Sequence, residues 1–187
     1  MLKKIFFYYL WTMKYCSKCG SDKIRHAIPE GDSYKRYICD NCGAIHYQNP
    51  RVVVGTIPIY EGKILMCQRG IEPRKGFWNL PVGFMENGET MSEGAQRETR
   101  EETGAEVDII RLHTTYHVLH INQVLAFYLA KVIAPTFGAT TESLDVRLFA
   151  PHEIPWDLIA FPAHQFILEK YLAEPDYQGV HVGEFRQ

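Results

Sequence analysis

GFMENGETMSEGAQRETREETGA, residues 83–105, is the stretch around which the rest of the chain is organised. Thr90 and Glu93 have the spacing of a capping box, in which the threonine hydroxyl accepts one free N–H at the start of a helix and the glutamate reaches back to another. Gly104 ends the helix, because glycine adopts the left-handed conformation after a helix without a Cβ clash. The stretch therefore predicts a loop followed by a helix between Thr90 and Gly104.

Three glutamates of this helix, Glu98, Glu101 and Glu102, stand at i, i+3 and i+4. Their carboxylates therefore project from one helical face. Such a group of oxygen ligands suits a hard divalent cation. The alternative is an ordinary solvated face, on which Arg97 makes i,i+4 ion pairs with Glu93 and Glu101. The spacing of the flanking residues favours the metal site.

Counting from Gly83, the chain has a glycine, five residues, Glu89, seven residues and then RETREETGA, which ends at Ala105. This arrangement resembles the Nudix box of the Nudix hydrolase family. Thr99 stands where the family pattern has an aliphatic residue, a departure that leaves the carboxylates untouched. The resemblance implies an α/β fold, an α/β/α sandwich with a mixed sheet, and an enzyme that hydrolyses a nucleoside diphosphate linked to another group.

The resemblance also implies roles for particular residues. The implied ligands of a catalytic Mg²⁺ or Mn²⁺ are Glu98, Glu101, Glu102 and the backbone at Gly83. The implied structural pair is Glu89 with Arg97, which would fix the ligand-bearing helix. A divalent cation suits this chemistry because it neutralises phosphate oxygens, polarises phosphorus and lowers the pKa of the attacking water.

The general base and the substrate contacts are less well specified by the box. We expect Glu142 to be the base, with Asp145 as second choice, because ADP-ribose-cleaving relatives use an acidic residue from this loop. An exposed loop glutamate without a role is the alternative. Arg69, Arg74 and Lys75 precede the box and are expected to contact phosphates.

Two C-x-x-C pairs lie near the N-terminus, separated by nineteen residues: Cys16 with Cys19, and Cys39 with Cys42. This spacing predicts a tetrahedral zinc site in a small ribbon, with Gly20 and Gly43 turning backbone N–H groups toward the sulfurs. A segment this short needs the metal to fold. Two disulfides or a redox pair are the alternatives, and nothing marks the chain as secreted. Cys67 is expected to be a buried small hydrophobe.

The chain has 187 residues, of which 46% are hydrophobic and 22% charged, enough for one globular domain and a small appendage. We expect an extension over residues 1–13, the zinc ribbon over 14–48, a Nudix hydrolase domain over 50–175 and a mobile or partner-contacting tail over 176–187. The net charge of −2 argues against broad capture of nucleic acid. No apolar run is long enough for a membrane span, and the apolar residues 5–11 lack a signal-peptide cleavage site, so a cytoplasmic protein is expected.

Alternating and apolar runs predict the remaining elements. Strands are expected over residues 51–60, 63–69, 105–113, 118–121, 123–132 and 146–150, with an extended stretch over 76–84. Glu61-Gly62 is expected to form a tight hairpin turn between the first two strands. Apolar residues at helical spacing predict a helix over 161–172.

The substrate is expected to be ADP-ribose or a related dinucleotide such as FAD, because residues 60–90 resemble zinc-ribbon Nudix hydrolases of that specificity. NADH pyrophosphatase is one alternative, although the Ser-Gln-Pro-Trp-Pro-Phe-Pro signature of those enzymes does not follow Gly104. A nucleotide-sensing or nucleic-acid-binding Nudix regulator is another, although such proteins commonly lose box carboxylates that this chain keeps. RNA decapping is a third alternative, but it would favour a strongly basic surface, which the net charge of −2 does not provide. A homodimer is expected, since ADP-ribose-cleaving relatives typically pair.

Overall fold

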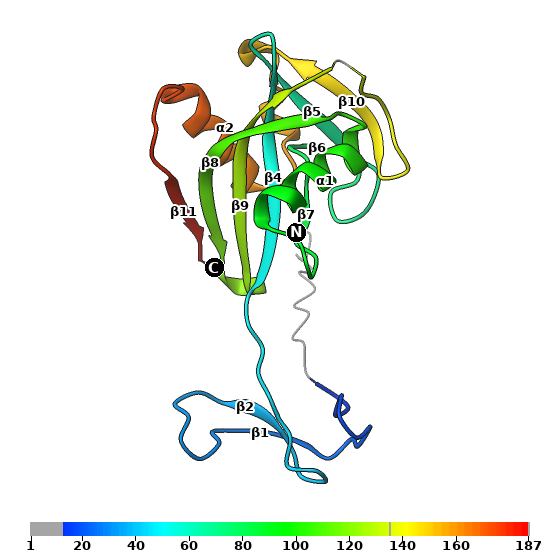
Figure 1. Ribbon diagram of the computed structural model, residues 1–187, viewed down its shortest axis with the longest axis vertical. Coiled ribbons are helices and arrows are strands. Elements are labelled where there is room, and N and C mark those ends of the chain that lie inside the picture. Colours follow the sequence, from blue (N-terminus) through cyan, green and yellow to red (C-terminus); the bar gives the residue numbers. More distant parts are fainter. Residues whose placement is uncertain (1–12, 135, 187) are drawn as a thin grey trace, which may run out of the picture. The chain divides into compact units, whose positions relative to one another are not determined.

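The computed structural model describes residues 13–134 and 136–186, and the chain divides into two compact units, residues 1–50 and 51–187. The predicted N-terminal extension lies outside the described residues as far as residue 12. The first unit holds a three-stranded antiparallel sheet of β1 (Ile24–Ala27), β2 (Arg36–Cys39) and β3 (Ile45–His46) (Figure 1). In the described part of the chain, no helix is both long and apolar enough to cross a membrane.

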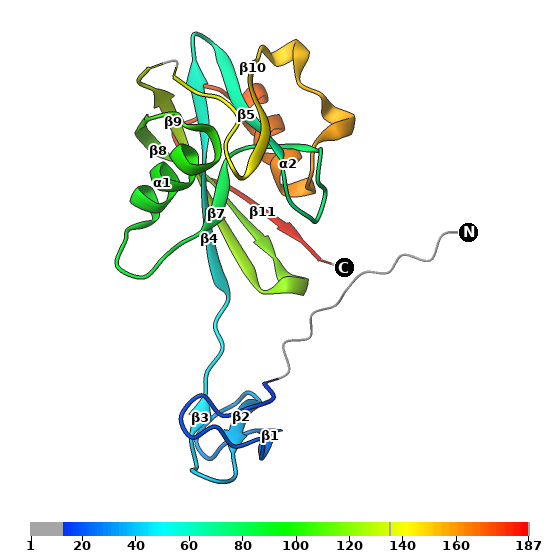
Figure 2. The same cartoon turned by 90° about the vertical axis from the view of Figure 1, so that its right-hand side faces the viewer.

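The second unit is built on one large mixed sheet. Its elements are β4 (Arg51–Tyr60), β5 (Lys63–Arg69), β6 (Trp78–Asn79), β7 (Val82–Phe84), α1 (Met91–Thr103), β8 (Val107–Val118), β9 (Gln123–Val132), β10 (Ser143–Phe149), α2 (Pro162–Ala173) and β11 (His181–Phe185). The strand order is β10-β5-β4-β9-β8-β11, with β6 on β5 and β7 on β4. The β4–β9 and β8–β11 pairs are parallel. Because α1 and α2 cover opposite faces, the predicted α/β/α sandwich is confirmed (Figure 2).

The β4–β5 hairpin turns at Glu61 and Gly62, as predicted, with φ angles of 49° and 75°. Its strands pair directly only at Ile59↔Ile64 and Tyr60↔Lys63. Beyond that point the strands part, β7 pairs with β4, and β6 pairs with β5. The predicted extended stretch over 76–84 is therefore two short strands that fill the opening of the hairpin.

Helix α1 has the predicted ends. Thr90 and Glu93 form both hydrogen bonds of the capping box, and Gly104 is left-handed with φ 75°. The helix packs on the sheet through a small apolar cluster of Ala95, Val54 and Ala126. These local contacts fix which residues of α1 face the sheet and which face solvent.

Thr99, the departure from the family pattern, is fully buried against Thr56 of β4. Their hydroxyl oxygens lie 2.6 Å apart, and the Thr99 hydroxyl donates to the carbonyl of Ala95 at 2.7 Å. Because a hydroxyl has one proton, Thr56 is the donor to Thr99. A polar pair therefore occupies a place where an aliphatic side chain was expected.

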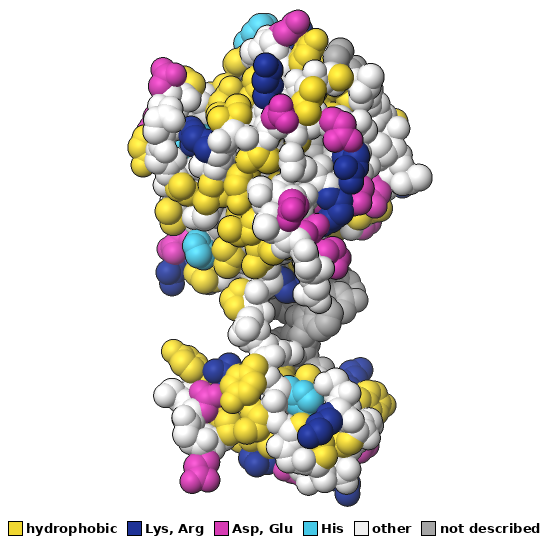
Figure 3. All heavy atoms as spheres, in the orientation of Figure 1, with side chains coloured by type: hydrophobic (Ala, Val, Ile, Leu, Met, Phe, Trp, Pro, Cys, Tyr) yellow, Lys and Arg dark blue, Asp and Glu magenta, His cyan; other side chains and the backbone are white. Residues whose placement is uncertain are grey.

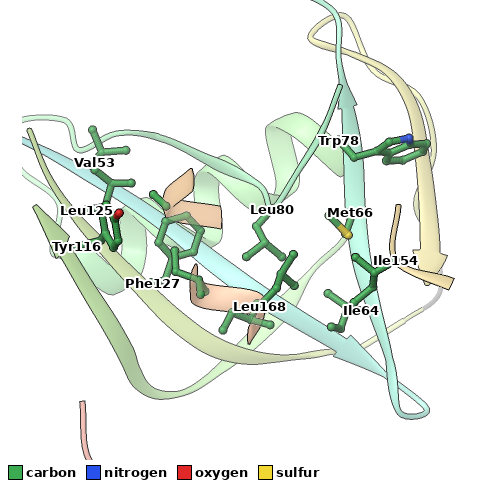
Figure 4. Close-up of a cluster of buried hydrophobic side chains, with 13 residues drawn as sticks. Val53, Ile64, Met66, Trp78, Leu80, Tyr116, Leu125, Phe127, Ile154 and Leu168 are labelled. Carbon is green, nitrogen blue, oxygen red and sulfur yellow. The ribbon is translucent and has the colours of Figure 1, made fainter. Parts of the chain in front are cut away.

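The larger core lies on the α2 face of the sheet. Among the side chains that meet there are Phe127, Leu80, Met66, Ile64 and Leu168 (Figure 4). The α2 helix supplies Ile167 and Leu168, both fully buried, in agreement with the predicted helix over 161–172. This core supports the sheet from behind the face that carries α1.

Two parts of the chain differ from the sequence-based expectations. β8 runs unbroken to Val118, with two register shifts against β9, so the strand expected over 118–121 is wrong. Residues 119–121 form a 3-10 turn that ends at the left-handed Asn122. Residues 181–185, expected to lie in a mobile or partner-contacting tail, form β11 and pair with β8. Without β11 this strand would be a sheet edge with unpaired backbone groups.

A buried pair of histidines, His113 of β8 and His181 of β11, joins these two strands. The rings of His113 and His181 have centroids 5.0 Å apart, and the Tyr177 ring lies against His181 with centroids 4.5 Å apart and the planes tilted by 41°. Within the described residues, neither Nε2 atom has a hydrogen-bond partner. Burial lowers the pKa of His113 to about 4, with the nearby His181 adding to the effect. Both rings are therefore neutral at neutral pH, because a buried cation here would lack an acceptor.

We expect His113 to make the domain sensitive to acid. Its folded-state pKa of about 4 lies below the ordinary value, so its contribution to stability is full above about pH 6.5 and is lost as the pH falls toward about 4. Urea unfolding at pH 7 and pH 4.5 should show that His113→Gln loses roughly 2 kcal/mol less than the wild type over this interval. His152→Gln, an exposed control, should behave as the wild type. An unchanged pH dependence in His113→Gln would contradict the assignment.

Candidate functional site

Arg97 is the centre of the acidic face of α1. Its Nε and Nη2 donate to the two carboxylate oxygens of Glu89 at 3.0 and 2.8 Å. Nη2 also donates to the carbonyl of Phe84 at 3.0 Å. Nη1 donates to Glu98 at 2.7 Å and to Glu101 at 3.0 Å. All five N–H groups of the guanidinium are thus used, and the two residues expected to pair, Glu89 and Arg97, lie as a bidentate ion pair.

This ion pair also ties down the loop before the helix. Glu89 accepts the N–H of Glu86 at 2.7 Å, in addition to its two bonds from Arg97. Hydrogen bonding from Arg97 and from that N–H holds the pKa of Glu89 at about 2. The carboxylate is therefore ionised at any working pH, and the loop stays attached to α1.

Glu98 is buried directly against Gly83 of β7. A Cβ atom placed on Gly83 would lie 2.1 Å from the carboxyl carbon of Glu98, so any other residue would push the carboxylate away. Burial raises the pKa of Glu98, and the bond from Arg97 opposes this effect. The glycine of the box therefore makes room for a carboxylate beside the strand backbone.

Glu102 lies one helical turn further along, at the opening of the β4–β5 hairpin. Its Oε2 accepts the N–H of Val82 at 3.0 Å and lies 3.4 Å from the Sγ of Cys67. Burial raises the pKa of Glu102 to about 7, while the Val82 and Cys67 hydrogen bonds and the charge of Arg69 act in the opposite direction. Cys67 is buried, as expected of a small hydrophobe, and its thiol is also in contact with the site.

The donor set offered by these residues is composed of oxygens, which fits Mg²⁺ or Mn²⁺. The carboxylates of Glu98 and Glu101 converge on Nη1 of Arg97, whereas that of Glu102 turns toward Val82. Among the residues that the structure describes, the four cysteines are the one group of three or more His, Cys, Asp or Glu side chains gathered closely enough to hold a metal ion, with ligand atoms within 4.8 Å of one another. The three glutamates share a face, but their ligand atoms do not meet that closely.

The two candidate bases differ in their surroundings. Glu142 is exposed, its carbonyl accepts the N–H of Gly70 at 3.0 Å, and its charge contributes to raising the pKa of Glu98. Asp145 is paired with Arg147 at 2.5 Å and accepts the N–H of Val146 at 2.8 Å. Of the two candidates, Glu142 is therefore the one whose charge affects the pKa of a residue on the acidic face of α1.

The three predicted phosphate contacts lie at or beside the loop between β5 and β6. The guanidinium of Arg69 stacks on Phe161 at 5.0 Å, and its Nε donates to the carbonyl of Pro73 at 2.9 Å. Arg74 stacks on Phe77 at 5.1 Å, and Lys75 is exposed. Figure 3 shows charged side chains gathered over α1, while hydrophobic side chains gather over β8 and β9. Phe161 could not be singled out from the sequence, because its contact with Arg69 joins distant segments.

The four cysteines of the ribbon form a compact cluster. Their sulfurs lie within 4.8 Å of one another, with Cys16 and Cys42 at 3.7 Å and Cys19 and Cys39 at 3.6 Å. A tetrahedron with Zn–S bonds of about 2.3 Å has sulfur–sulfur edges of about 3.8 Å, so the cluster fits zinc. All five cysteines of the chain are free, and the alternative of two disulfides is therefore wrong.

Contacts at Cys19 favour its thiolate form, whereas at Cys42 the N–H of Ala44 is outweighed by the neighbouring cysteine side chains and by burial, which raise the pKa of that thiol to about 12. The N–H of Ser21 hydrogen-bonds the sulfur of Cys19 and lowers its pKa to about 6, and Asn41 adds a further donor at 3.7 Å. Gly20 and Gly43 follow the knuckles with φ angles of 75° and 71°, but their own N–H groups donate to the carbonyls of Cys16 and Cys39 at 2.8 and 2.9 Å and not to the sulfurs. Outer contacts such as those at Cys19 orient thiolate ligands for a metal.

Comparisons with known proteins agree with this geometry. Residues 14–48 match a zinc-ribbon family model described as Nudix N-terminal, and residues 49–170 match the NUDIX domain model. The ADP-ribose pyrophosphatase of Methanocaldococcus jannaschii is 31% identical over 135 residues, which cover 67% of this chain and 75% of that protein. A NUDIX hydrolase structure from Nitrosomonas europaea is 47% identical, with a TM-score of 0.89, over 94% of this chain and 100% of that one.

A second kind of relative is longer than this chain. The NAD-capped RNA hydrolase NudC of Haemophilus influenzae is 30% identical over 106 residues, which cover 56% of this chain and 38% of that protein. This chain thus matches well under half of the length of that NudC protein. The similarity covers a shared domain and not the whole of that protein.

We expect one zinc ion per chain, held by the four ribbon cysteines. Cys39→Ser should lose the zinc and destabilise residues 14–48, because metal binding supplies the folding free energy of so small a unit. Metal analysis by mass spectrometry and limited proteolysis measure the two effects. Cys67→Ser, which also removes one thiol, should keep its zinc. Equal zinc contents in the wild type and Cys39→Ser would contradict the assignment.

Proposed function

The chain belongs to the Nudix family of hydrolases, and from that premise we propose that it hydrolyses the pyrophosphate bond of ADP-ribose, giving AMP and ribose 5-phosphate. In this proposal Glu98, Glu101 and Glu102, with the backbone at Gly83, hold Mg²⁺ or Mn²⁺. The same family membership makes a divalent cation part of the reaction. A bound ion of this kind neutralises phosphate oxygens and lowers the pKa of the attacking water.

One observation carries the assignment of the site. The guanidinium of Arg97 binds Glu89, Glu98 and Glu101 at once, so the loop, the ligand helix and two candidate ligands are fixed by one planar group. A structural ion pair on a solvated helix would not need this convergence, because exposed pairs contribute little to stability. The arrangement is what a preorganised cation site requires.

The other residues have complementary roles in the proposal. Glu142 accepts a proton from the water that attacks phosphorus, supported by the effect of its charge on Glu98. Arg69, Arg74 and Lys75 bind the phosphate oxygens of the substrate. Arg69 is the best supported of the three, because its charge also lowers the pKa of Glu102.

ADP-ribose is preferred because the relative that shares the greater part of its length with this chain bears that name. FAD is a second substrate of the same class, which would give AMP and FMN. A second candidate function is the hydrolysis of NADH or of an NAD cap, supported by the NudC relative. The NADH signature expected after the box is missing, which favours the first function. The homodimer remains a prediction.

Loss of a candidate metal ligand should abolish most of the activity. We expect Glu101→Gln or Glu102→Gln to lower kcat about a hundredfold or more with the fold intact, because transition-state charge stabilisation is lost. Steady-state hydrolysis at saturating Mg²⁺ and circular dichroism measure the two. Glu106→Gln makes the same charge change beyond the end of α1 and should keep the wild-type rate. Normal turnover in the Glu101 and Glu102 variants would reject the site.

Substrate preference separates the two candidate functions. At one Mg²⁺ concentration, we expect kcat/KM for ADP-ribose or FAD to exceed that for NADH and for NAD-capped RNA by roughly a hundredfold. This ratio corresponds to about 3 kcal/mol of differential transition-state binding, which a few pocket hydrogen bonds supply. Chromatography should identify AMP with ribose 5-phosphate or FMN. A higher kcat/KM for NADH or capped RNA would transfer the assignment to the second function.

A further inference from the structure

Cys67 is the buried side chain of β5 that touches the acidic face of α1. We propose that Cys67 is a positioning residue for the metal site: its thiol and the N–H of Val82 together fix one carboxylate oxygen of Glu102, so that the other oxygen is presented to the cation. This inference rests on the proposed function of Glu102 as a metal ligand. It assigns a role to a residue outside the box.

The geometry places two donors on the same oxygen. Oε2 of Glu102 lies 3.0 Å from the nitrogen of Val82 and 3.4 Å from the sulfur of Cys67. One donor comes from β7, which pairs with β4, and the other comes from β5, the second strand of the opened hairpin. Because both bonds end on Oε2, they set the rotation of the carboxylate about its last bond, a torsion that is otherwise broad. Oε1 is the oxygen left for an ion.

Cys67 has other acceptors nearby, and their strengths decide where its proton goes. The carbonyl oxygen and Oδ1 of Asn79 lie 3.6 and 3.7 Å from the sulfur. Both are neutral, farther away than Glu102, and belong to a residue whose amide donates to the carbonyl of Leu80 at 2.8 Å. A hydrogen bond to an ionised carboxylate is stronger than one to a neutral oxygen. The single thiol proton therefore goes to Glu102 whenever that carboxylate is ionised.

The position also explains why a thiol suits it. Cys67 is 1% exposed and belongs to an apolar cluster with Leu65, Ala130 and Val146. A thiol packs as a small hydrophobe and yet carries one weak donor, so it satisfies the cluster on one side and the carboxylate on the other. Valine would keep the packing without a donor, and serine would keep a donor.

The experiment compares Cys67→Val and Cys67→Ser with the wild type and with Val146→Ala. Val146 lies opposite Cys67 in the β10–β5 register and in the same cluster, so it is a matched packing control. Mn²⁺ affinity of the nucleotide-free protein is measured by electron paramagnetic resonance, with Glu98→Gln identifying the signal of the acidic site. The Mg²⁺ concentration for half-maximal ADP-ribose hydrolysis and the KM for ADP-ribose at saturating Mg²⁺ are measured alongside.

We expect Cys67→Val to weaken Mn²⁺ binding about tenfold and to raise the half-maximal Mg²⁺ concentration similarly, with KM for ADP-ribose unchanged. Cys67→Ser should retain most of the Mn²⁺ affinity, because a donor remains. Val146→Ala should unfold at a lower temperature but bind Mn²⁺ as the wild type does. A merely structural Cys67 would make Cys67→Val resemble Val146→Ala.

Each contrary outcome has a distinct meaning. Wild-type Mn²⁺ affinity in Cys67→Val overturns the positioning role, as does equal weakening in Val146→Ala. If the wild type binds Mn²⁺ but does not hydrolyse ADP-ribose, the substrate assignment fails while the Mn²⁺ titrations still decide the role of Cys67. If the wild type shows no Mn²⁺ signal that depends on Glu98, the metal site and the role of Cys67 fail together.

Discussion

The organisation of the acidic site depends on the planar guanidinium of Arg97. Its five N–H groups reach the loop through Glu89, the end of β7 through the Phe84 carbonyl, and the helix through Glu98 and Glu101. A lysine at this place would bring the same charge but only a point donor without the fixed fork. The positions of strand, loop and helix are thus set by the shape of one side chain as much as by its charge.

The opening of the β4–β5 hairpin supplies the second condition for this site. Residues 80–81 lie between β6 and β7, where the Pro81 carbonyl accepts the backbone N–H of Thr56 at 3.2 Å and side chains bind other backbone groups. The Leu80 N–H goes to Nδ1 of His164, and the Leu80 carbonyl accepts from the Asn79 amide. The Val82 N–H is available to Glu102 for the same reason. Because the β4–β5 hydrogen-bond ladder is interrupted here, a backbone N–H such as that of Val82 is free to bind a side chain, and a buried backbone group needs such a partner.

Local features of the fold could be predicted from the sequence because each has a short-range cause. The capping box at Thr90, the left-handed Gly104 and the turn at Glu61-Gly62 depend on residues a few positions apart. The contact of Cys67 with Glu102 and the pairing of β11 with β8 join segments far apart in the chain. The periodicity of a segment does not indicate which distant segment it contacts. The apolar run around Cys67 therefore gave no sign of the contact with Glu102, and residues 181–185 could not be recognised as a strand. The roles of the box residues as metal ligands were predicted from the family resemblance, because neither helical spacing nor the geometry of the carboxylates identifies a substrate or a reaction.

The buried hydroxyls of Thr56 and Thr99 have a consequence for how this sequence can evolve. The Thr99 hydroxyl keeps its bond to the Ala95 carbonyl if Thr56 becomes aliphatic, whereas the Thr56 hydroxyl, within the described residues, is bonded to Thr99 alone. Replacing Thr99 first leaves the buried Thr56 hydroxyl without a hydrogen-bond partner, which lowers the free energy of unfolding by about 1–3 kcal/mol. A lineage that moves toward the aliphatic residue of the family pattern therefore has one easy order of substitution, with β4 changing before α1. The hydroxyl pair therefore favours one order of substitution over the other.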